Sequence, residues 1–184
     1  KKIDIKQMFW GPKKFDATKK ISNEDLETLK EAVQLSASSY GLQFYKVLII
    51  EDPEIRAQLK EAAYGQTQLT DASQVFVFCN YTNPVDADVD KFVQLTAETR
   101  QQNVDALKAH ADGMKGSING QTEEAKKIWT AKQTYIALGT LLAAAGEMRI
   151  DACPMEGFNP QEFNRILGLG KKGLNAAVVA TVGY

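Results

Sequence analysis

The spacing of apolar residues along the chain predicts a mixed series of helices and strands. Intervals of three and four residues are typical of amphipathic helices, and short continuous apolar runs are typical of buried strands. On this basis we expect helices over 22–36, 52–62, 86–111, 122–146 and 159–168. We expect strands over 45–50, 74–80, 150–153 and 174–184.

Local signals support several of these elements. Ser22 can cap the first helix, and the side chain of Asp25 can bond back to the start of the helix to complete a capping box. Asp52 and Asn159 each precede a proline, which suits the first position of a helix. The strand over 45–50 is apolar enough to be buried on both faces. The helix from Thr122 is apolar all round, so we expect it to be central and buried, with Ile128, Ala131, Tyr135, Leu138, Leu142 and Ala145 repeating along it.

The order of these elements favours an α+β fold. Helices and strands are mixed without a regular βαβ alternation, which indicates a sheet flanked by helices, of the α+β or three-layer kind. A chain of 184 residues without repeats or a linker is expected to form a single domain over 1–184.

Composition excludes several classes of protein. A net charge of -1 supplies no positive field for nucleic acid, and no apolar run approaches the roughly 18 residues of a membrane span. Cys79 and Cys153 lie far apart without a CxxC pattern, which argues against a zinc site or a disulfide framework. The opening Lys1-Lys2-Ile3-Asp4 is unlike a signal peptide. We therefore expect a cytoplasmic protein without a metal.

Side chains suited to catalysis are scarce. His110 is the only histidine, so a Ser-His-Asp triad or a histidine metal site is hard to build, and a solvated surface position is expected. Cys79 fits the core, and Gly168-Leu169-Gly170 follows a helix rather than a strand, unlike a phosphate loop. Glu156 lies between a strand end and a capped helix. That segment is either a ligand-binding loop or an ordinary turn.

Five segments carry a resemblance to a known family. In order along the chain they are Lys13–Lys20 (KKFDATKK), Leu35–Gln43 (LSASSYGLQ), Gly65–Ser73 (GQTQLTDAS), Trp129–Gly139 (WTAKQTYIALG) and Ala152–Phe158 (ACPMEGF). Together they make the chain from about residue 13 to 184 resemble the oxygen-insensitive NAD(P)H nitroreductases, in particular their dihydropteridine-reductase-like branch.

The resemblance implies a fold, a cofactor and a reaction. The family forms an α+β sandwich, a three-layer arrangement with a central, mostly antiparallel sheet, assembled as an intertwined homodimer. FMN would bind in pockets between the subunits. NAD(P)H would reduce the flavin and leave, and the flavin would then reduce a nitroaromatic, a quinone or a pteridine in a ping-pong reaction. Because the flavin carries the chemistry, no catalytic side chain is required.

The resemblance also assigns cofactor-binding roles near the flavin ring. Pro154 would lie against the ring, and the backbone of Glu156 and Gly157 would reach toward flavin N5. Lys13 would lie near N1 and O2, where a positive charge stabilises the reduced anionic ring.

Two further groups of residues would complete the ring site. Ser38, Ser39 and Gln43 would border the flavin from the neighbouring subunit. Gln66 or Gln68 would meet its pyrimidine edge.

The chain departs from the family pattern where the FMN phosphate would bind. Phe9 stands where the family usually has arginine, and Gly11 where it often has a small hydroxyl residue. The family's C-terminal arm, which brings further cations to the phosphate, is not part of this sequence. Phe44 replaces a common proline, and Tyr64 a tryptophan.

Two interpretations of these departures remain open. The aromatic side chains of Phe9, Trp10, Phe44 and Tyr45 could line an altered pocket, in which the phosphate would be bound more weakly. Alternatively, the N-terminal segment is shifted in register, and Lys14 or Lys6 takes the phosphate.

The sequence therefore supports two hypotheses of function. The first is an FMN-dependent NAD(P)H oxidoreductase working as a homodimer on small aromatic acceptors. The second is a non-catalytic or engineered protein on the same scaffold, which binds a flat apolar ligand or a flavin without phosphate.

Overall fold

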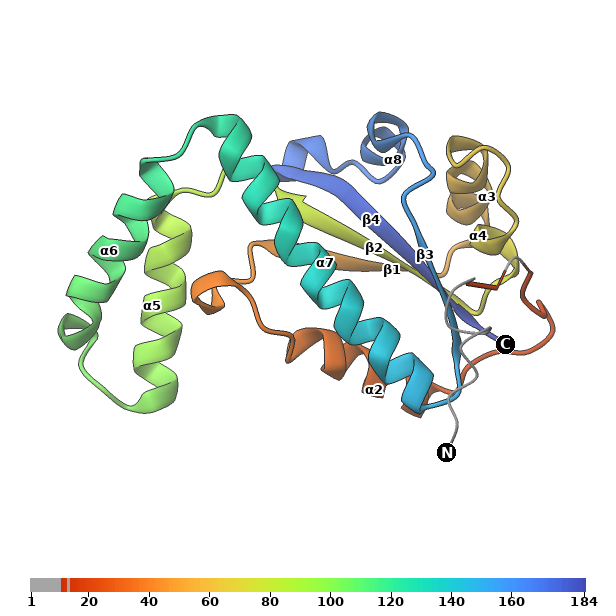
Figure 1. The fold of residues 1–184 in the computed structure, drawn as a ribbon, viewed down its shortest axis with the longest axis horizontal. Helices are drawn as coiled ribbons and strands as arrows, with labels where there is room; N and C mark the ends of the chain where they lie inside the picture. Colours follow the sequence, from red (N-terminus) through yellow and green to blue (C-terminus); the bar gives the residue numbers. More distant parts are fainter. Residues whose placement is uncertain (1–10, 13) are drawn as a thin grey trace.

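The structure, a computed structural model, describes residues 11–12 and 14–184. Helices dominate the ends and strands the centre (Figure 1). In chain order the elements are α2 (Asn23–Gln34), η1 (Ser39–Gly41), β1 (Tyr45–Ile50), α3 (Pro53–Ala62), α4 (Gln68–Asp71), β2 (Gln74–Tyr81), α5 (Asp86–Arg100), η2 (Val104–Leu107), α6 (Lys108–Asn119), α7 (Glu123–Glu147), β3 (Asp151–Met155), α8 (Pro160–Ile166), η3 (Gly170–Lys172) and β4 (Leu174–Gly183).

The strands form one four-stranded sheet in the order β1-β2-β4-β3. Every pairing is antiparallel, with Val77 opposite Val179 near the middle of the sheet. The order places β1 and β3 at opposite edges. Pro154 lies in the edge strand β3, which is where a residue without an N–H donor can be accommodated. The predicted α+β class with a mostly antiparallel sheet is confirmed.

Helices cover both faces of the sheet, which makes three layers. One face packs Phe76, Phe78 and Val178 against α2 and α7, and the other packs Val75 and Val77 against α3, α4 and α8. This division follows from the strand repeat, in which successive side chains point to opposite faces. Figure 1 shows α7 running along one face of the sheet.

The predicted helix starts are confirmed by their caps. The hydroxyl of Ser22 accepts a hydrogen bond from the N–H of Asp25, and the carboxylate of Asp52 accepts from Glu54 and Ile55. Thr122 caps α7 and Asn159 caps α8 in the same way. These side chains satisfy N–H groups that a helix cannot pair internally.

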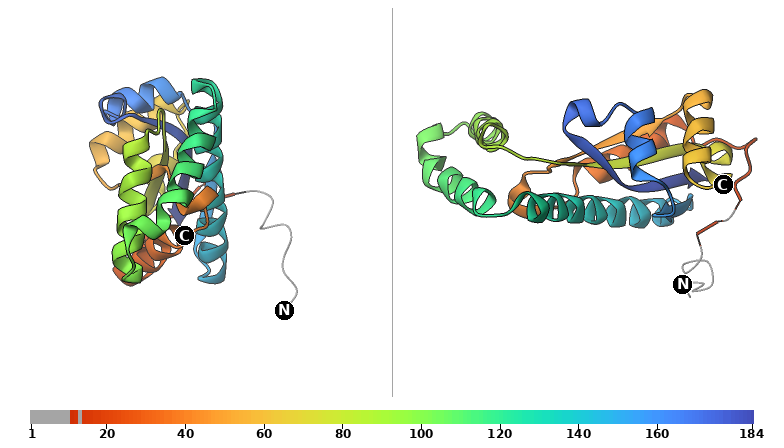
Figure 2. Two further views of the ribbon diagram at one scale, coloured as in Figure 1. Left: turned by 90° about the vertical axis from the view of Figure 1, so that its left-hand side faces the viewer. Right: turned by 90° about the horizontal axis from the view of Figure 1, so that it is seen from above.

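The helix predicted over 86–111 is wrong as a single element. The first part, α5, ends at Arg100, because Gln101 adopts a left-handed conformation with φ of 51°. A second helix, α6, then runs through Gly113 and Gly116. The two helices form a hairpin around a small core that includes Val93 and Met114 and also Leu42 and Phe44 from the segment before β1. Figures 1 and 2 show this hairpin at one end of an elongated molecule.

Two burial predictions need correction. β1 is an edge strand whose middle residues are only half-buried, so it is not covered on both faces. In α7 the buried stripe includes Ala137 and Leu141, but the opposite side of this helix is open in a single chain. There, Ile128 is 50% exposed and Ile136 is 46% exposed.

Candidate functional site

The turn between β3 and α8 presents two residues between buried anchors. Met155 and Phe158 are both buried, whereas Glu156 and Gly157 between them are exposed. The N–H of Phe158 donates to the carbonyl oxygen of Glu156 at 2.9 Å, which closes a tight three-residue turn at Gly157. The apolar anchors therefore hold a short polar segment at the surface.

Side chains from two other elements hold this turn. The hydroxyl of Tyr135, on α7, donates to Oε1 of Glu156 at 2.6 Å. The amide nitrogen of Gln66, in the loop between α3 and α4, donates to the carbonyl oxygen of Gly157 at 2.6 Å and to that of Ala63 at 3.0 Å. Burial and the neighbouring Glu156 carboxylate raise the pKa of Tyr135 to about 12. Its hydroxyl therefore stays a donor at neutral pH.

The held turn contains two exposed residues whose backbone donors are not used within it. Within the part of the chain that the structure describes, the backbone N–H groups of Glu156 and Gly157 have no acceptor. Pro154, in β3 two residues before Glu156, is exposed as well. A flat apolar surface beside two free donors fits an aromatic heterocycle that carries an acceptor atom on its edge.

Gly11 lies directly against β3. A Cβ atom at Gly11 would lie 3.0 Å from Sγ of Cys153 and 3.1 Å from its Cα. Glycine at this position therefore allows a close backbone approach, which is a physical reason for glycine where the family often has a small hydroxyl residue. Burial raises the pKa of the Cys153 thiol, so it is not a ready nucleophile.

The segment before β1 lies at the other edge of the sheet. Ser38, Ser39 and Gln43 precede β1, whereas Pro154 belongs to β3, and the strand order separates these two edges by β2 and β4. In a single chain the two groups of predicted flavin residues therefore lie toward opposite edges of the sheet.

The segment before β1 is anchored to α7 through a residue that the sequence analysis missed. The backbone N–H of Ser39 donates to Oε1 of Gln133 at 2.8 Å, and Gln133 itself donates to the carbonyl oxygen of Trp129. The residue pattern does not single out Gln133, because the buried stripe of α7 also carries Thr130 and Thr134. Tyr135, which the apolar spacing predicts to be a core residue, instead donates its hydroxyl hydrogen bond to Glu156.

The side chains of two predicted site residues already make contacts within the chain. The amide nitrogen of Gln43 donates to the carbonyl oxygens of Gln34 and Ser36, which are left unpaired at the end of α2. Phe44 is buried, with its ring stacked on Tyr81 and edge-on to Trp129. Phe44 is thus part of the core around the hairpin rather than an open wall.

The remaining predicted residues divide into two groups. Tyr64 is 77% exposed with a left-handed backbone (φ 58°) just before Gln66, and Gln68 is half-buried at the start of α4. Phe9, Trp10 and Lys13 lie outside the described residues.

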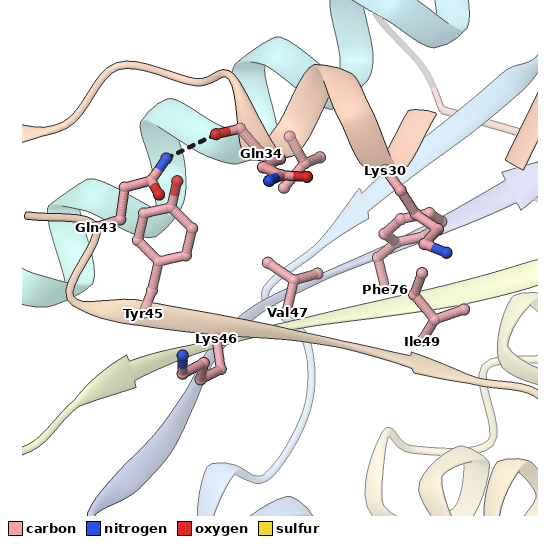
Figure 3. Close-up of a pocket in the computed structure, with 9 residues that line it drawn as sticks. Lys30, Gln34, Gln43, Tyr45, Lys46, Val47, Ile49 and Phe76 are labelled. Atoms are coloured by element: carbon pink, nitrogen blue, oxygen red, sulfur yellow. Dashed lines mark hydrogen bonds between the residues drawn. The ribbon is translucent and has the colours of Figure 1, made fainter. Parts of the chain in front are cut away.

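A groove runs between α2 and the edge strand β1, with a volume of about 310 Å³. Figure 3 shows the bond between Gln43 and Gln34 at one end of it, beside Tyr45. Its charged lining side chains are Lys30 and Lys46. The Tyr45 hydroxyl is buried without a hydrogen bond among the described residues, and burial raises its pKa. This groove is at the edge of the sheet away from Pro154.

Neither a metal cluster nor a membrane span is found in the described ranges. No three His, Cys, Asp or Glu side chains of residues 11–12 and 14–184 gather as metal ligands. None of the helices there combines the length and the apolar character needed to cross a bilayer.

The chain is similar to proteins of one family. The family model described as "Nitroreductase family" matches residues 12–184. The Bacillus subtilis protein named "Putative NAD(P)H nitroreductase YfkO" is 32% identical over 201 residues, which cover 99% of this chain and 87% of that protein.

Two solved structures share the fold. A nitroreductase-like protein from Streptococcus mutans superposes with a TM-score of 0.83 at 18% identity, covering 94% of this chain and 83% of that one. A "putative nitroreductase in complex with FMN" from Exiguobacterium sibiricum gives a TM-score of 0.80 at 19% identity, covering 94% and 82%. With a family model that spans nearly all of the described residues and a relative at 32% identity, the chain belongs to the nitroreductase family.

Proposed function

We propose that this protein is an FMN-dependent NAD(P)H oxidoreductase that reduces nitroaromatics, quinones or pteridines. The observation that carries the proposal is the exposed Glu156–Gly157 turn of this nitroreductase-family chain, whose two N–H groups have no acceptor among the described residues. The name of YfkO includes NAD(P)H, and the E. sibiricum neighbour is an FMN complex, which supports the same cofactors here.

The residues around the turn fit the ring of FMN. Pro154 offers a flat apolar face, and the N–H groups of Glu156 and Gly157 offer donors to an acceptor atom of the ring. Gln66 has its amide nitrogen committed, which leaves its oxygen as an acceptor. The bound flavin would supply hydride transfer, while these residues would bind and orient it.

We also propose that the active form is a homodimer. Ser38, Ser39 and Gln43 lie at the sheet edge opposite Pro154, so a pocket that uses both groups needs two chains. The open side of α7 carries Ile128 and Ile136, and a second subunit would bury their apolar surface.

Cofactor binding and turnover test the first proposal. The purified protein should bind FMN near one per chain, NADH or NADPH should bleach the flavin, and a nitroaromatic or quinone should restore its absorbance. Gly157→Ala should weaken FMN binding, because the new Cβ would lie 3.3 Å from Nε2 of Gln66. The matched change Gly113→Ala, where the Cβ meets open space, should not weaken it. A protein that binds a flat ligand but is inert with FMN and NAD(P)H would support the non-catalytic alternative.

The dimer is tested by sedimentation. Ile136→Lys should favour the monomer, because it places a charge on the open side of α7. Leu95→Lys is a suitable control, since Leu95 is also exposed but lies on α5 of the hairpin. If Ile136→Lys sediments like the wild type, the interface lies elsewhere.

A further inference from the structure

The Glu156–Gly157 turn is attached to the protein by contacts that act on different groups. Gln66 holds the carbonyl oxygen of Gly157, and the hydrogen bond from Phe158 holds that of Glu156. Tyr135 alone, among the described residues, holds the Glu156 side chain. The turn is thereby tied to the loop before α4 on one side and to α7 on the other.

The geometry of β3 directs Glu156 toward α7. Ala152 packs in the core shared with α7, and side chains two apart in a strand share a face, so Pro154 lies on the same side of β3 as Ala152. Glu156 follows directly after the end of the strand. Tyr135 extends from the open side of α7 and meets the carboxylate at 2.6 Å. A hydroxyl bound to an ionised carboxylate makes a short and comparatively strong hydrogen bond.

We propose that Tyr135 is a positioning residue, which fixes the Glu156–Gly157 turn so that its two free N–H groups face the reactive edge of the bound ring. The inference rests on the proposed FMN site. Tyr135 acts through Glu156: it holds the side chain, and the side chain in turn limits rotation of the peptide units on either side. A turn without this hold would sample orientations in which the donors point away from the ring.

The restraint that Tyr135 places on the Glu156–Gly157 turn can be measured without flavin. In the FMN-free protein, Tyr135→Phe should speed hydrogen exchange at the Phe158 amide about tenfold, because that amide bonds to Glu156 and opens when the turn opens; tenfold corresponds to about 1.4 kcal/mol. Tyr184→Phe is the matched control, since it also removes one exposed tyrosine hydroxyl. Glu156→Gln should preserve the slow exchange, because its amide oxygen still accepts from Tyr135. Equal exchange in Tyr135→Phe and Tyr184→Phe would overturn the proposal.

A redox comparison separates positioning from a general structural effect. N5 of oxidised flavin accepts a hydrogen bond, whereas N5–H of reduced flavin does not. Tyr135→Phe should therefore weaken binding of oxidised FMN about fivefold to tenfold and that of reduced FMN much less. If Tyr135→Phe weakened the binding of oxidised and reduced FMN equally, Tyr135 would have only a structural role. If the wild type binds no FMN, the proposed function fails, while the exchange experiment still decides whether Tyr135 holds the turn.

Discussion

The backbone N–H of Ser39 and the side-chain oxygen of Gln133 are joined by a hydrogen bond of 2.8 Å. The bond links the segment before β1 to the buried stripe of α7, although the two residues are far apart in sequence. Gln133 is itself buried and donates to Trp129, so both polar ends of its amide are used. The predicted flavin-bordering segment therefore depends on a helix residue for its position.

Removing this amide should destabilise the protein. Gln133→Ala leaves the Ser39 N–H without its acceptor, which costs about 1–3 kcal/mol when the group is shielded from water. Urea unfolding followed by circular dichroism measures the loss. Gln58→Ala, at an exposed position of α3, should stay within about 0.5 kcal/mol of the wild type. Equal stability of the two variants would show that water replaces the Gln133 oxygen at little cost.

Arg56 should not tolerate replacement by lysine. It is 6% exposed, and its guanidinium donates to the carbonyl oxygens of Leu69, Ala72 and Ser73 at the end of α4. Lysine keeps the charge but cannot reproduce the planar fork, so Arg56→Lys should cost about 2–3 kcal/mol in the free energy of unfolding. Arg100→Lys, on the exposed end of α5, serves as control and should be nearly neutral. If Arg56→Lys left the free energy of unfolding unchanged, the ammonium group of lysine would be able to hydrogen-bond these carbonyl oxygens as well as the guanidinium does.

Alkaline pH should weaken the bond between Tyr135 and Glu156. The pKa of Tyr135 is raised to about 12 in the folded chain, above the usual value of about 10. A group whose pKa is raised by folding makes its full contribution to the stability of the folded state below a pH of about 10. This contribution is lost as the pH rises toward about 12. The free energy of unfolding should therefore fall more steeply between these limits in the wild type than in Tyr135→Phe. Because Tyr45 titrates in both proteins, identical slopes would contradict the assignment.

The phosphate prediction can be tested with two ligands. If Phe9 stands where a phosphate-binding arginine is usual, calorimetry should show similar affinities for riboflavin and FMN. Phe9→Arg should then strengthen the binding of FMN by about tenfold or more, since a hydrogen bond between charged groups contributes about 1.5–3 kcal/mol. The affinity for riboflavin should not change. A strong wild-type preference for FMN would favour the alternative in which another cation, such as Lys14, takes the phosphate.

Local signals predicted most of the secondary structure. The side chains of Ser22, Asp52 and Asn159 cap the helices expected after them, and the apolar runs at 45–50 and 74–80 form β1 and β2. The single helix over 86–111 was wrong because the residue pattern does not predict the left-handed conformation of Gln101, which ends α5 before α6 packs back against it. The roles of individual residues at the flavin site stay predictions.

The sequence by itself determined most of the elements, the fold class and, through five short segments, the family. Those properties depend on residues near one another in the chain, where caps, turns and apolar spacing act directly. Only the tertiary structure decided which edge of the sheet each strand occupies, and therefore that Ser38 and Pro154 lie apart in one chain. It also brought Tyr135 to Glu156 and Gln66 to Gly157, because contacts between distant residues arise from packing of the whole sheet and its helices.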